Sequence, residues 1–346
     1  MTIHKVHFQP VNIEIDVDEG ETILNAAFRQ GVALTHGCRE GQCGACKSFL
    51  LDGDIELDRY STFALPEYES EEGYVLLCRC HAYSDLEVEL INYDEDVIRL
   101  GVPIETFETT IASIEPLTHD IRRLVLELKE PERKFKFTAG QYAAIRIPGS
   151  EEDRAFSMAN TPRSTKQLEF IIKVIPGGLF SGLLDGGFEI GQTLEITAPY
   201  GVFMLREKYD TEIICVGGGS GMAPIWSLLN DMAERGIKRK ATYFYGARTT
   251  KDLFYLDRLR ELEERLPGFR FVPALSLASP DEGWEGETGL ITEVLERNLE
   301  GNHSKTQAYL CGPPPMIDAA IPVLVSKGIS EDRIFFDKFT STAKVE

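Results

Sequence analysis

The sequence predicts a multidomain protein of the α+β and α/β classes, with a small mixed sheet, an antiparallel β-barrel and a five-stranded parallel sheet in succession. Three observations predict this order. Short strands surround one helical segment near the N-terminus, alternating strands punctuated by Gly and Pro fill the middle, and strands alternate with helices towards the C-terminus. We place the domains at residues 1–95, 106–206 and 207–346, with a linker at 96–105.

The first domain combines short strands with one helix over residues 22–31. The hydroxyl of Thr22 suits the N-cap position, and Gly31 suits the C-terminal end of the helix. The apolar face of this helix consists of Ile23, Leu24, Ala27 and Phe28. The strands expected in this domain are residues 5–11, 12–17, 47–53 and 85–91. Together they predict a mixed sheet crossed by one helix.

The second and third domains differ in their predicted secondary structure. The strands expected in the second domain are residues 122–129, 141–148 and 167–175, and the last of these alternates apolar and polar residues as a barrel strand does. The strands expected in the third domain are residues 212–219, 241–248, 269–276, 308–314 and 333–339. Helical patterns at 223–236 and 255–267 lie between them, so a ligand crevice is expected at the carboxyl ends of these strands.

Composition favours a soluble globular protein, since 43% of the residues are hydrophobic and 27% are charged. No apolar run approaches the roughly 18 residues that a membrane span requires. The N-terminal residues also lack the basic and apolar regions of a signal peptide. We therefore expect a cytoplasmic protein.

The net charge of −20 disfavours nucleic acids and anionic membranes as partners. Residues 1–96 hold 20 acidic and 6 basic residues, so this first quarter of the chain carries most of the acidity. This acidity has two possible roles: a solvated face that aids solubility, or a docking surface for a partner protein.

Cys38, Cys43 and Cys46 have the spacing C-x4-C-x2-C, and Cys78 follows 32 residues later. Clustered thiols in a reducing cytosol are more often metal ligands or redox groups than disulfides. Four thiolates suit either tetrahedral zinc or an iron–sulfur cluster. Structural zinc sites usually pair two C-x2-C motifs, whereas this three-plus-one spacing matches the plant-type [2Fe–2S] pattern. The spacing therefore predicts a [2Fe–2S] cluster, in a loop whose glycines let backbone N–H groups approach sulfur.

Two further stretches suit a flavin. The segment "DRAFSMANTP", residues 153–162, supplies a cation for a pyrophosphate, an aromatic ring and a hydroxyl for the flavin N5 edge. In "FIIKVIPGGLFSGLL", residues 170–184, Gly177 and Gly178 open a turn into an expected helix, a suitable place for a phosphate. Their order along one β-rich domain favours a flavin site over an incidental glycine turn.

A glycine-rich loop, "CVGGGSGMAP" at residues 215–224, follows a predicted strand, and Pro224 suits the start of a helix. Its glycines permit close approach of a pyrophosphate, yet the pattern departs from the common G-x-G-x-x-G fingerprint. On its own, the loop leaves open whether it binds phosphate.

Residues 1–95 resemble a plant-type ferredoxin module, which implies a β-grasp fold. The resemblance implies that the cluster ligands are Cys38, Cys43, Cys46 and Cys78. Cys78 fits because "CRCHAYSD" keeps the family spacing from the fourth ligand to Ser84 and Asp85. Cys80 is the competing fourth ligand, and we expect it to be a packing thiol. His36 and His81 raise the alternative of a Rieske centre, which four well-spaced cysteines make unnecessary.

The rest of the chain resembles the ferredoxin-NADP⁺ reductase superfamily, which implies FAD in the barrel and a nicotinamide coenzyme in the parallel-sheet domain. FAD rather than FMN rests on this resemblance alone. The residues implied to bind FAD are Arg154, Ala155, Phe156, Ser157, Ile172, Lys173, Val174, Gly178, Leu179 and Ser181. The residues implied to bind the nicotinamide coenzyme are Gly218, Gly219, Ser220, Gly221, Pro224, Cys311, Gly312 and Pro313. Ser157 and Cys311 are implied to be catalytic.

Two details refine these sites. The superfamily often places an Arg for NADPH just after the third-strand Ser, where this chain has Leu277, so NADH is the expected coenzyme. Arg248 is the residue that could overturn this preference. The chain end "FFDKFTSTAKVE" resembles a family ending in which an aromatic residue covers the flavin. Phe339 is the expected cover, with Phe336 as the alternative.

The three modules together predict an electron relay. A nicotinamide delivers two electrons as hydride, a [2Fe–2S] cluster accepts one at a time, and flavin can take the pair and release electrons singly. The module order resembles reductase components of bacterial multicomponent oxygenases, most closely those of soluble di-iron monooxygenases for methane, propane or related hydrocarbons. The resemblance implies an NADH:acceptor reductase, monomeric when free, that passes electrons to a di-iron hydroxylase.

Two other functions remain open at this stage. The first is the reductase of an aromatic-ring dioxygenase, which uses the same chemistry. The second is a ferredoxin-type carrier whose flavin domain is vestigial, against which the intact flavin and nicotinamide motifs argue. A membrane quinone-reducing subunit would need an anchor helix, and no suitable apolar run is present.

Overall fold

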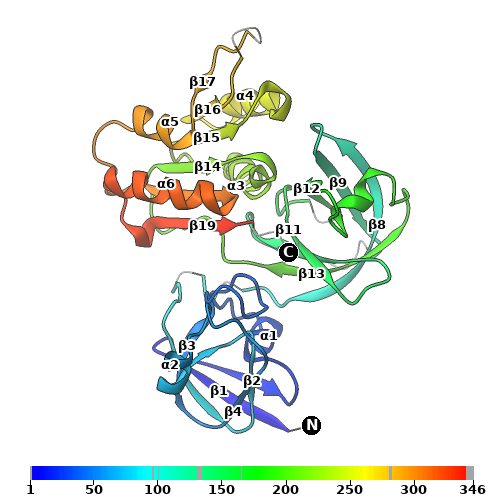
Figure 1. Cartoon of the computed structure of the whole chain (residues 1–346), viewed down its shortest axis with the longest axis vertical. Helices are drawn as coiled ribbons and strands as arrows, with labels where there is room; N and C mark the ends of the chain where they lie inside the picture. Colours follow the sequence, from blue (N-terminus) through cyan, green and yellow to red (C-terminus); the bar gives the residue numbers. More distant parts are fainter. Residues whose placement is uncertain are drawn as a thin grey trace. The chain divides into compact units, whose positions relative to one another are not determined.

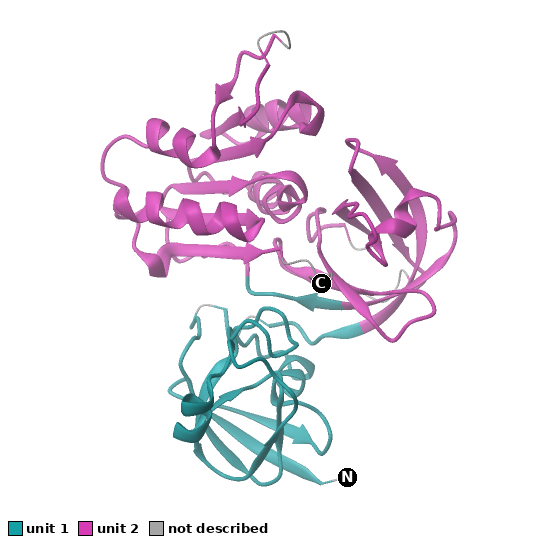
Figure 2. Ribbon diagram, in the orientation of Figure 1, with its two compact units in different colours: residues 1–105, 198–202 teal, residues 106–197, 203–346 magenta. Residues whose placement is uncertain are grey.

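The chain forms two compact units, one of residues Met1–Glu105 with Ala198–Val202, the other of Thr106–Thr197 with Phe203–Glu346 (Figure 2). The computed structural model describes residues 2–95, 97–99, 101–130, 135–164, 166–279 and 283–339.

A five-stranded mixed sheet forms the centre of the first unit (Figure 1). Its strands are β1 (Ile3–Gln9), β2 (Ile13–Asp18), β3 (Lys47–Asp52), β5 (Tyr74–Leu76) and β7 (Leu86–Leu90). They pair in the order β2-β1-β7-β3-β5, with β1 and β7 parallel and the other pairs antiparallel. A separate pair joins β4 (Ile55–Leu57) to β6 (Cys80–Ala82). The predicted mixed sheet is confirmed, with the three short strands β4, β5 and β6 added.

Helix α1 (Ile23–Arg29) forms where its cap and apolar face predict it. The Thr22 hydroxyl accepts the Asn25 N–H at 3.3 Å, and the predicted apolar face is buried. Gly31 follows the helix with φ +73°, a conformation that favours glycine. The second helix of this unit, α2 (Glu67–Glu72), buries none of its residues, so no apolar pattern predicted it.

The described part of the predicted linker packs against the first unit. Val97 and Ile98 are buried, and the Ala33 N–H donates a hydrogen bond to the Ile98 carbonyl at 3.0 Å. A Cβ atom on Gly101 would overlap the Gly31 carbonyl, so the two backbones touch directly. These residues are therefore docked rather than extended.

The second unit begins with an antiparallel sheet of β8 (Glu105–Pro116), β9 (Ile121–Leu128), β10 (Tyr142–Arg146), β11 (Asp153–Ser157), β12 (Gln167–Lys173) and β13 (Thr193–Tyr200). The strand order is β11-β10-β13-β8-β9-β12. The two edge strands meet through a bridge between Met158 and Phe170 and a 2.7 Å hydrogen bond from the Ala159 N–H to the Glu169 carbonyl. The predicted barrel is therefore nearly closed.

The remaining sheet is parallel, with the order β17-β16-β15-β14-β18-β19. Its strands are β14 (Ile213–Gly217), β15 (Ala241–Ala247), β16 (Phe269–Leu275), β17 (Glu287–Thr288), β18 (Gln307–Gly312) and β19 (Ile334–Lys338). All five predicted strands form. The two-residue β17 adds a sixth at the edge, which is too short to leave a sequence pattern.

Helices cover both faces of this parallel sheet. Side chains of α3 (Met222–Arg235) and α4 (Leu256–Arg265) pack in one buried cluster, and those of α5 (Ile291–Asn298) and α6 (Pro314–Ser326) pack in another. Short 3-10 helices lie at Ser181–Asp185, Gly219–Gly221, Thr250–Asp252 and Glu331–Arg333. Within the described ranges, no helix has the length and apolar character needed to cross a membrane.

Candidate functional site

The cysteine loop directs backbone N–H groups at sulfur. The Cys38 N–H donates to Cys43 Sγ at 3.3 Å, and the N–H groups of Glu40 and Gln42 donate to Cys38 Sγ at 3.4 and 3.2 Å. A hydrogen bond with the Cys43 thiol and these backbone donors lower the pKa of Cys38 to about 5. Donors to sulfur favour the thiolate, the form that binds iron.

The four sulfurs lie in two pairs, and this arrangement separates the two metal hypotheses. Cys38 is hydrogen-bonded to Cys43, and Cys46 to Cys78. These four residues are all described, and no three of their Sγ atoms lie within 4.8 Å of one another. Tetrahedral zinc, with Zn–S near 2.3 Å, would hold all four sulfurs about 3.8 Å apart. The donor set therefore fits a cluster of more than one metal better than a single zinc ion.

The loop can adopt this form because glycine stands where a side chain would reach the ligands. A Cβ atom on Gly37 would lie 2.9 Å from Cys43 Sγ, which is closer than real Cβ atoms come. Gly41 has φ +70°, and a Cβ there would press on Arg79 and Tyr60 at 2.9 Å. The predicted close wrapping of the loop is thus visible in the geometry.

The positions of Cys80 and the two histidines argue against their being ligands. Cys80 is completely buried on β6, where desolvation raises the pKa of its thiol to about 12. His36 Nδ1 lies 2.7 Å from the Leu34 carbonyl, and His81 Nε2 lies 3.1 Å from Asp58 Oδ2. These contacts favour Cys78 as the proposed fourth ligand and give no support to a Rieske centre.

The proposed flavin strand is β11, paired with β10. Arg154 is held by Glu152 at 2.8 Å, so it would exchange that carboxylate for a pyrophosphate. The Phe156 ring lies 5.0 Å from that of Phe180, and Ser157 is buried at the end of the strand. Ala155, between Arg154 and Phe156, is exposed. Because side chains alternate along a strand, Arg154 and Phe156 lie on one face of β11, and Ala155 and Ser157 lie on the other.

The proposed pyrophosphate turn follows β12. Ser181 Oγ accepts the Ile175 N–H at 3.1 Å, and a Cβ on Gly178 would overlap this hydroxyl. The helix expected after the turn is a five-residue 3-10 helix, a form that occurs in short connecting segments. Leu179 is exposed beside Gly178.

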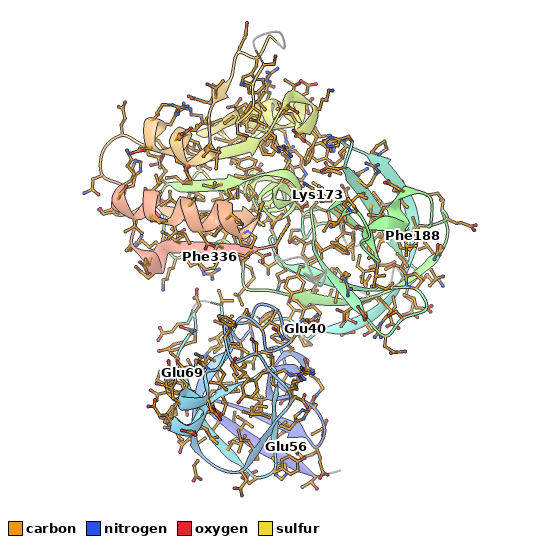
Figure 3. All side chains as sticks on the ribbon, in the orientation of Figure 1. Glu40, Glu56, Glu69, Lys173, Phe188 and Phe336 are labelled. Carbon is orange, nitrogen blue, oxygen red and sulfur yellow. The ribbon has the colours of Figure 1, made fainter. Side chains whose placement is uncertain are left out.

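The residues that end β12 share this region. Ile172 is buried in the barrel, whereas Lys173 points to solvent and pairs with Asp120 at 3.1 Å (Figure 3). The Val174 N–H donates to the Asp120 carbonyl at 2.7 Å. Of these three residues, Lys173 has an exposed side chain, the Ile172 side chain is buried, and the Val174 N–H is already hydrogen-bonded.

The glycine-rich loop joins β14 to α3, which begins at Met222, with Pro224 in its first turn. Gly218, Gly219 and Ser220 are partly exposed, so their backbone is accessible to a ligand. A Cβ on Gly221 would overlap the Cys311 carbonyl, which brings this loop directly against the end of β18. The two proposed nicotinamide signatures are thus neighbours at the carboxyl ends of adjacent strands, together with Gly312 and Pro313.

Cys311 and Phe339 lie on the same side of the parallel sheet. Cys311 is completely buried in the cluster formed with α3 and α4, and Phe339 packs against that cluster. The Phe339 N–H donates to the Gly312 carbonyl at 2.9 Å. Phe336, labelled in Figure 3, is exposed and pairs in register with Leu310, a residue of the opposite cluster. The geometry therefore favours Phe339 as the proposed flavin cover.

Asp337, which sequence reasoning missed, is paired in register with Cys311. It is partly buried, and among the described residues it has no ion-pair partner, so desolvation raises its pKa to about 6. The only signal in the sequence was its place in a predicted strand, two residues before Phe339.

The raised pKa of Asp337 makes stability depend on pH. Well below pH 4 the carboxyl is protonated in both the folded and the unfolded states. As the pH rises from about 4 to 6, the unfolded state loses this proton first, so the free energy of unfolding falls, and the loss is complete above pH 6. Asp337→Asn should therefore stabilise the protein by about 1–2 kcal/mol at pH 7.5 and much less at pH 4.5. Calorimetric unfolding at both pH values measures this. Asp318→Asn, which removes an exposed carboxylate paired with Lys338, is the control and should give no gain at pH 7.5; an equal effect of Asp337→Asn at both pH values would contradict the assignment.

Family models match three successive stretches of the chain. They are the 2Fe-2S iron-sulfur cluster binding domain at residues 6–83, the oxidoreductase FAD-binding domain at 108–205 and the oxidoreductase NAD-binding domain at 215–321. With the paired cysteine sulfurs, the barrel and the glycine-rich loop, these matches define an iron–sulfur flavoprotein reductase that uses a [2Fe–2S] cluster, FAD and NADH.

Proteins that are similar to this chain over its whole length identify the family within this class. The reductase component of propane 2-monooxygenase from Mycolicibacterium goodii is 50% identical, over 98% of this chain and 97% of that protein. The phenol 2-monooxygenase reductase component DmpP from Pseudomonas sp. strain CF600 is 36% identical, over 98% and 95%. The crystal structure of Amycolatopsis cytochrome P450 reductase GcoB is 31% identical, covers 98% of this chain and 99% of that chain, and superposes with a TM-score of 0.87. The chain belongs to the family of multicomponent monooxygenase reductases, NADH-dependent oxidoreductases that pass electrons through FAD to a [2Fe–2S] cluster.

Proposed function

We propose that this chain is the cytoplasmic, monomeric reductase for a di-iron hydroxylase that oxidises propane or a related hydrocarbon. The observation that carries the proposal is the level of identity. Four propane 2-monooxygenase reductase components are 49–50% identical to this chain, each over 98% of it. The toluate 1,2-dioxygenase electron transfer component is 33% identical, which supports the ring-dioxygenase alternative less.

The proposed sites divide the work among named residues. When bound, FAD takes hydride from NADH and releases electrons singly to the [2Fe–2S] cluster. Cys38, Cys43, Cys46 and Cys78 would hold the cluster, and the backbone donors at Glu40 and Gln42 would stabilise its thiolates. Arg154 would neutralise pyrophosphate charge, and Ser157 would donate to the flavin edge. Cys311 is completely buried, so residues packed against it would have to move for a nicotinamide to reach it.

The preference for NADH has support at the ends of two adjacent strands. The Leu277 N–H donates to the Arg248 carbonyl at 2.8 Å, which places the two residues side by side. Leu277 is exposed and offers no charge to a 2′-phosphate. Arg248 is exposed beside it and is the cation that could bind such a phosphate.

Docking of the hydroxylase is proposed on the acidic first unit, near the cysteine loop. Phe63 is 97% exposed there, in a turn anchored by the buried Ala64 and by a 2.9 Å hydrogen bond from the Ser61 N–H to the Gly41 carbonyl. Exposed aromatic side chains are frequent sources of binding energy in protein interfaces. An acidic surface with one apolar anchor suits a partner with basic residues around an apolar pocket.

Phe63→Ala should raise the KM for the hydroxylase about tenfold or more and leave NADH:ferricyanide activity unchanged. Steady-state turnover with a purified propane-type hydroxylase measures this, and raising the salt concentration should raise the same KM. Ile190→Ala, which truncates an exposed apolar side chain in the flavin module, is the matched control and should have no effect. If neither Phe63→Ala nor added salt changes the KM for the hydroxylase, the docking proposal is wrong.

Two measurements separate the alternatives. Faster reduction of a ring-dioxygenase component than of a di-iron hydroxylase would favour the dioxygenase reductase. A visible spectrum of the purified protein with cluster bands but no flavin bands would favour a ferredoxin-type carrier.

A further inference from the structure

The end of strand β13 belongs to the first unit. That unit includes residues Ala198–Val202, and the first three of them are the last residues of β13. Tyr200, the last residue of β13, is 8% exposed. Its ring meets that of Phe28 on α1 edge to face, with 5.6 Å between the ring centroids. Tyr200 therefore joins the first unit as a core side chain.

Arg39 connects this side chain to the cysteine loop. Its guanidinium carbon lies over the Tyr200 ring, 4.0 Å from the centroid, the geometry of a cation–π contact. Arg39 follows Cys38 directly and has φ +59°, an uncommon conformation for a residue other than glycine. Such a conformation persists only where its surroundings hold it. The contact with Tyr200 is one such restraint.

The backbone on both sides of Arg39 takes part in the hydrogen bonds to sulfur. The Cys38 N–H donates to Cys43 Sγ, and the Glu40 N–H donates to Cys38 Sγ. A shift of Arg39 would therefore move two of the donors that set the charge on the proposed ligands. Its own positive charge lies one residue from Cys38.

We propose that Arg39 is a positioning residue for electron transfer from the flavin to the cluster, held in place by Tyr200. The proposal rests on the proposed cluster and flavin sites. The step moves one electron: the reduced flavin is oxidised, the cluster is reduced, and no bond or proton of Arg39 changes. Holding Arg39 on Tyr200 would keep the cysteine loop in one conformation and so keep the N–H donors of Cys38 and Glu40 on sulfur. Such donors favour the cluster state with one more negative charge.

The test uses the full chain with both cofactors and the variants Arg39→Gln, Tyr200→Leu and their combination. Anaerobic stopped-flow mixing with NADH should show unchanged flavin reduction, with cluster reduction slowed at least fivefold in each single variant. Because the two side chains act through one contact, the double variant should be no slower than the slower single variant. Tyr200→Phe, which keeps the ring, should behave as the wild type.

Two further readouts do not depend on turnover. In a redox titration followed by electron paramagnetic resonance, Arg39→Gln should lower the cluster potential, while Arg39→Lys should keep most of it. Hydrogen exchange at the amides of residues 200–202 should be faster in Arg39→Gln. If Arg39→Gln prevents cluster assembly, the proposal is tested with Arg39→Lys and with the comparison of Tyr200→Leu and Tyr200→Phe.

The outcomes are distinct. An unchanged rate of cluster reduction in Arg39→Gln overturns the positioning role, even if the potential shifts, and so do independent, multiplying effects of the two single variants. A wild-type protein that lacks a cluster spectrum, or whose flavin NADH does not reduce, instead overturns the proposed sites on which this inference rests.

Discussion

The Cys78→Ser variant is expected to lose its iron–sulfur cluster while keeping NADH-dependent reduction of ferricyanide. Cys78 is hydrogen-bonded to Cys46, and both residues are buried. A serine hydroxyl is a hard, poorly acidic ligand and replaces a thiolate badly at iron. The visible and electron paramagnetic resonance signals of the cluster should fall by at least 90%, whereas the flavin absorbance should remain.

Cys80→Ser is the matched control for that change. Cys80 lies two residues from Cys78, but its side chain packs in the interior of the first unit and has no hydrogen bond to a proposed ligand. We expect the cluster signals to be kept, with a loss of stability of about 1–2 kcal/mol from placing a hydroxyl in that site. Retention of the cluster in Cys78→Ser and its loss in Cys80→Ser would exchange the assignments.

Gly221→Ala is expected to slow flavin reduction by NADH at least tenfold. The added Cβ would overlap the Cys311 carbonyl, and because that atom belongs to the backbone, either the glycine-rich loop or β18 must shift. Displacements of about 1 Å can cost on the order of 100-fold in rate when they misplace reacting groups. Anaerobic stopped-flow absorbance measures the rate, and reduction by dithionite should show the same flavin and cluster contents as the wild type.

The same substitution at Gly219 distinguishes a steric effect from a general effect on the loop. Gly219 has φ +56°, but the nearest atom to a Cβ added there would be 3.9 Å away, so only the backbone conformation is penalised. We expect Gly219→Ala to slow flavin reduction by NADH less than fivefold. Equal losses in the two variants would mean that overlap with Cys311 is not the cause.

Much of the fold follows from local patterns in the sequence. Helix α1 combines a capping Thr22 with an apolar face, and strand β12 alternates buried Leu168 and Phe170 with more exposed residues. Each of these signals lies within a few residues, so it can be recognised without knowledge of the rest of the chain. The three-plus-one cysteine pattern is equally local, except for the distant Cys78.

The elements that escaped prediction lack such a signal. Helix α2 buries no residue, and β17 has two residues and owes its pairing to β16. Helix α6 is apolar on most sides and contains Pro322, so it has little helical periodicity to detect. For these segments, long-range packing rather than local preference decides the structure.

Within the candidate site, the sequence indicated which residues matter but not which of them meet. The choice between Phe336 and Phe339 became possible only from the register of β19 on β18, which puts alternate residues on opposite faces. The same register pairs Asp337 with Cys311, which the sequence alone did not indicate. The contact of Arg39 with Tyr200 joins residues far apart in the chain, and no periodicity links them.

The most direct test of the relay is the order in which its two coloured cofactors are reduced when the full chain is mixed with NADH under anaerobic conditions. We predict that the flavin absorbance falls first and that the cluster bleaches afterwards, at a rate independent of protein concentration, because both cofactors belong to one chain. Protein depleted of FAD should keep its cluster oxidised in the presence of NADH. Cluster reduction at an undiminished rate without FAD, or a cluster that stays oxidised beside a fully reduced flavin, would contradict the relay.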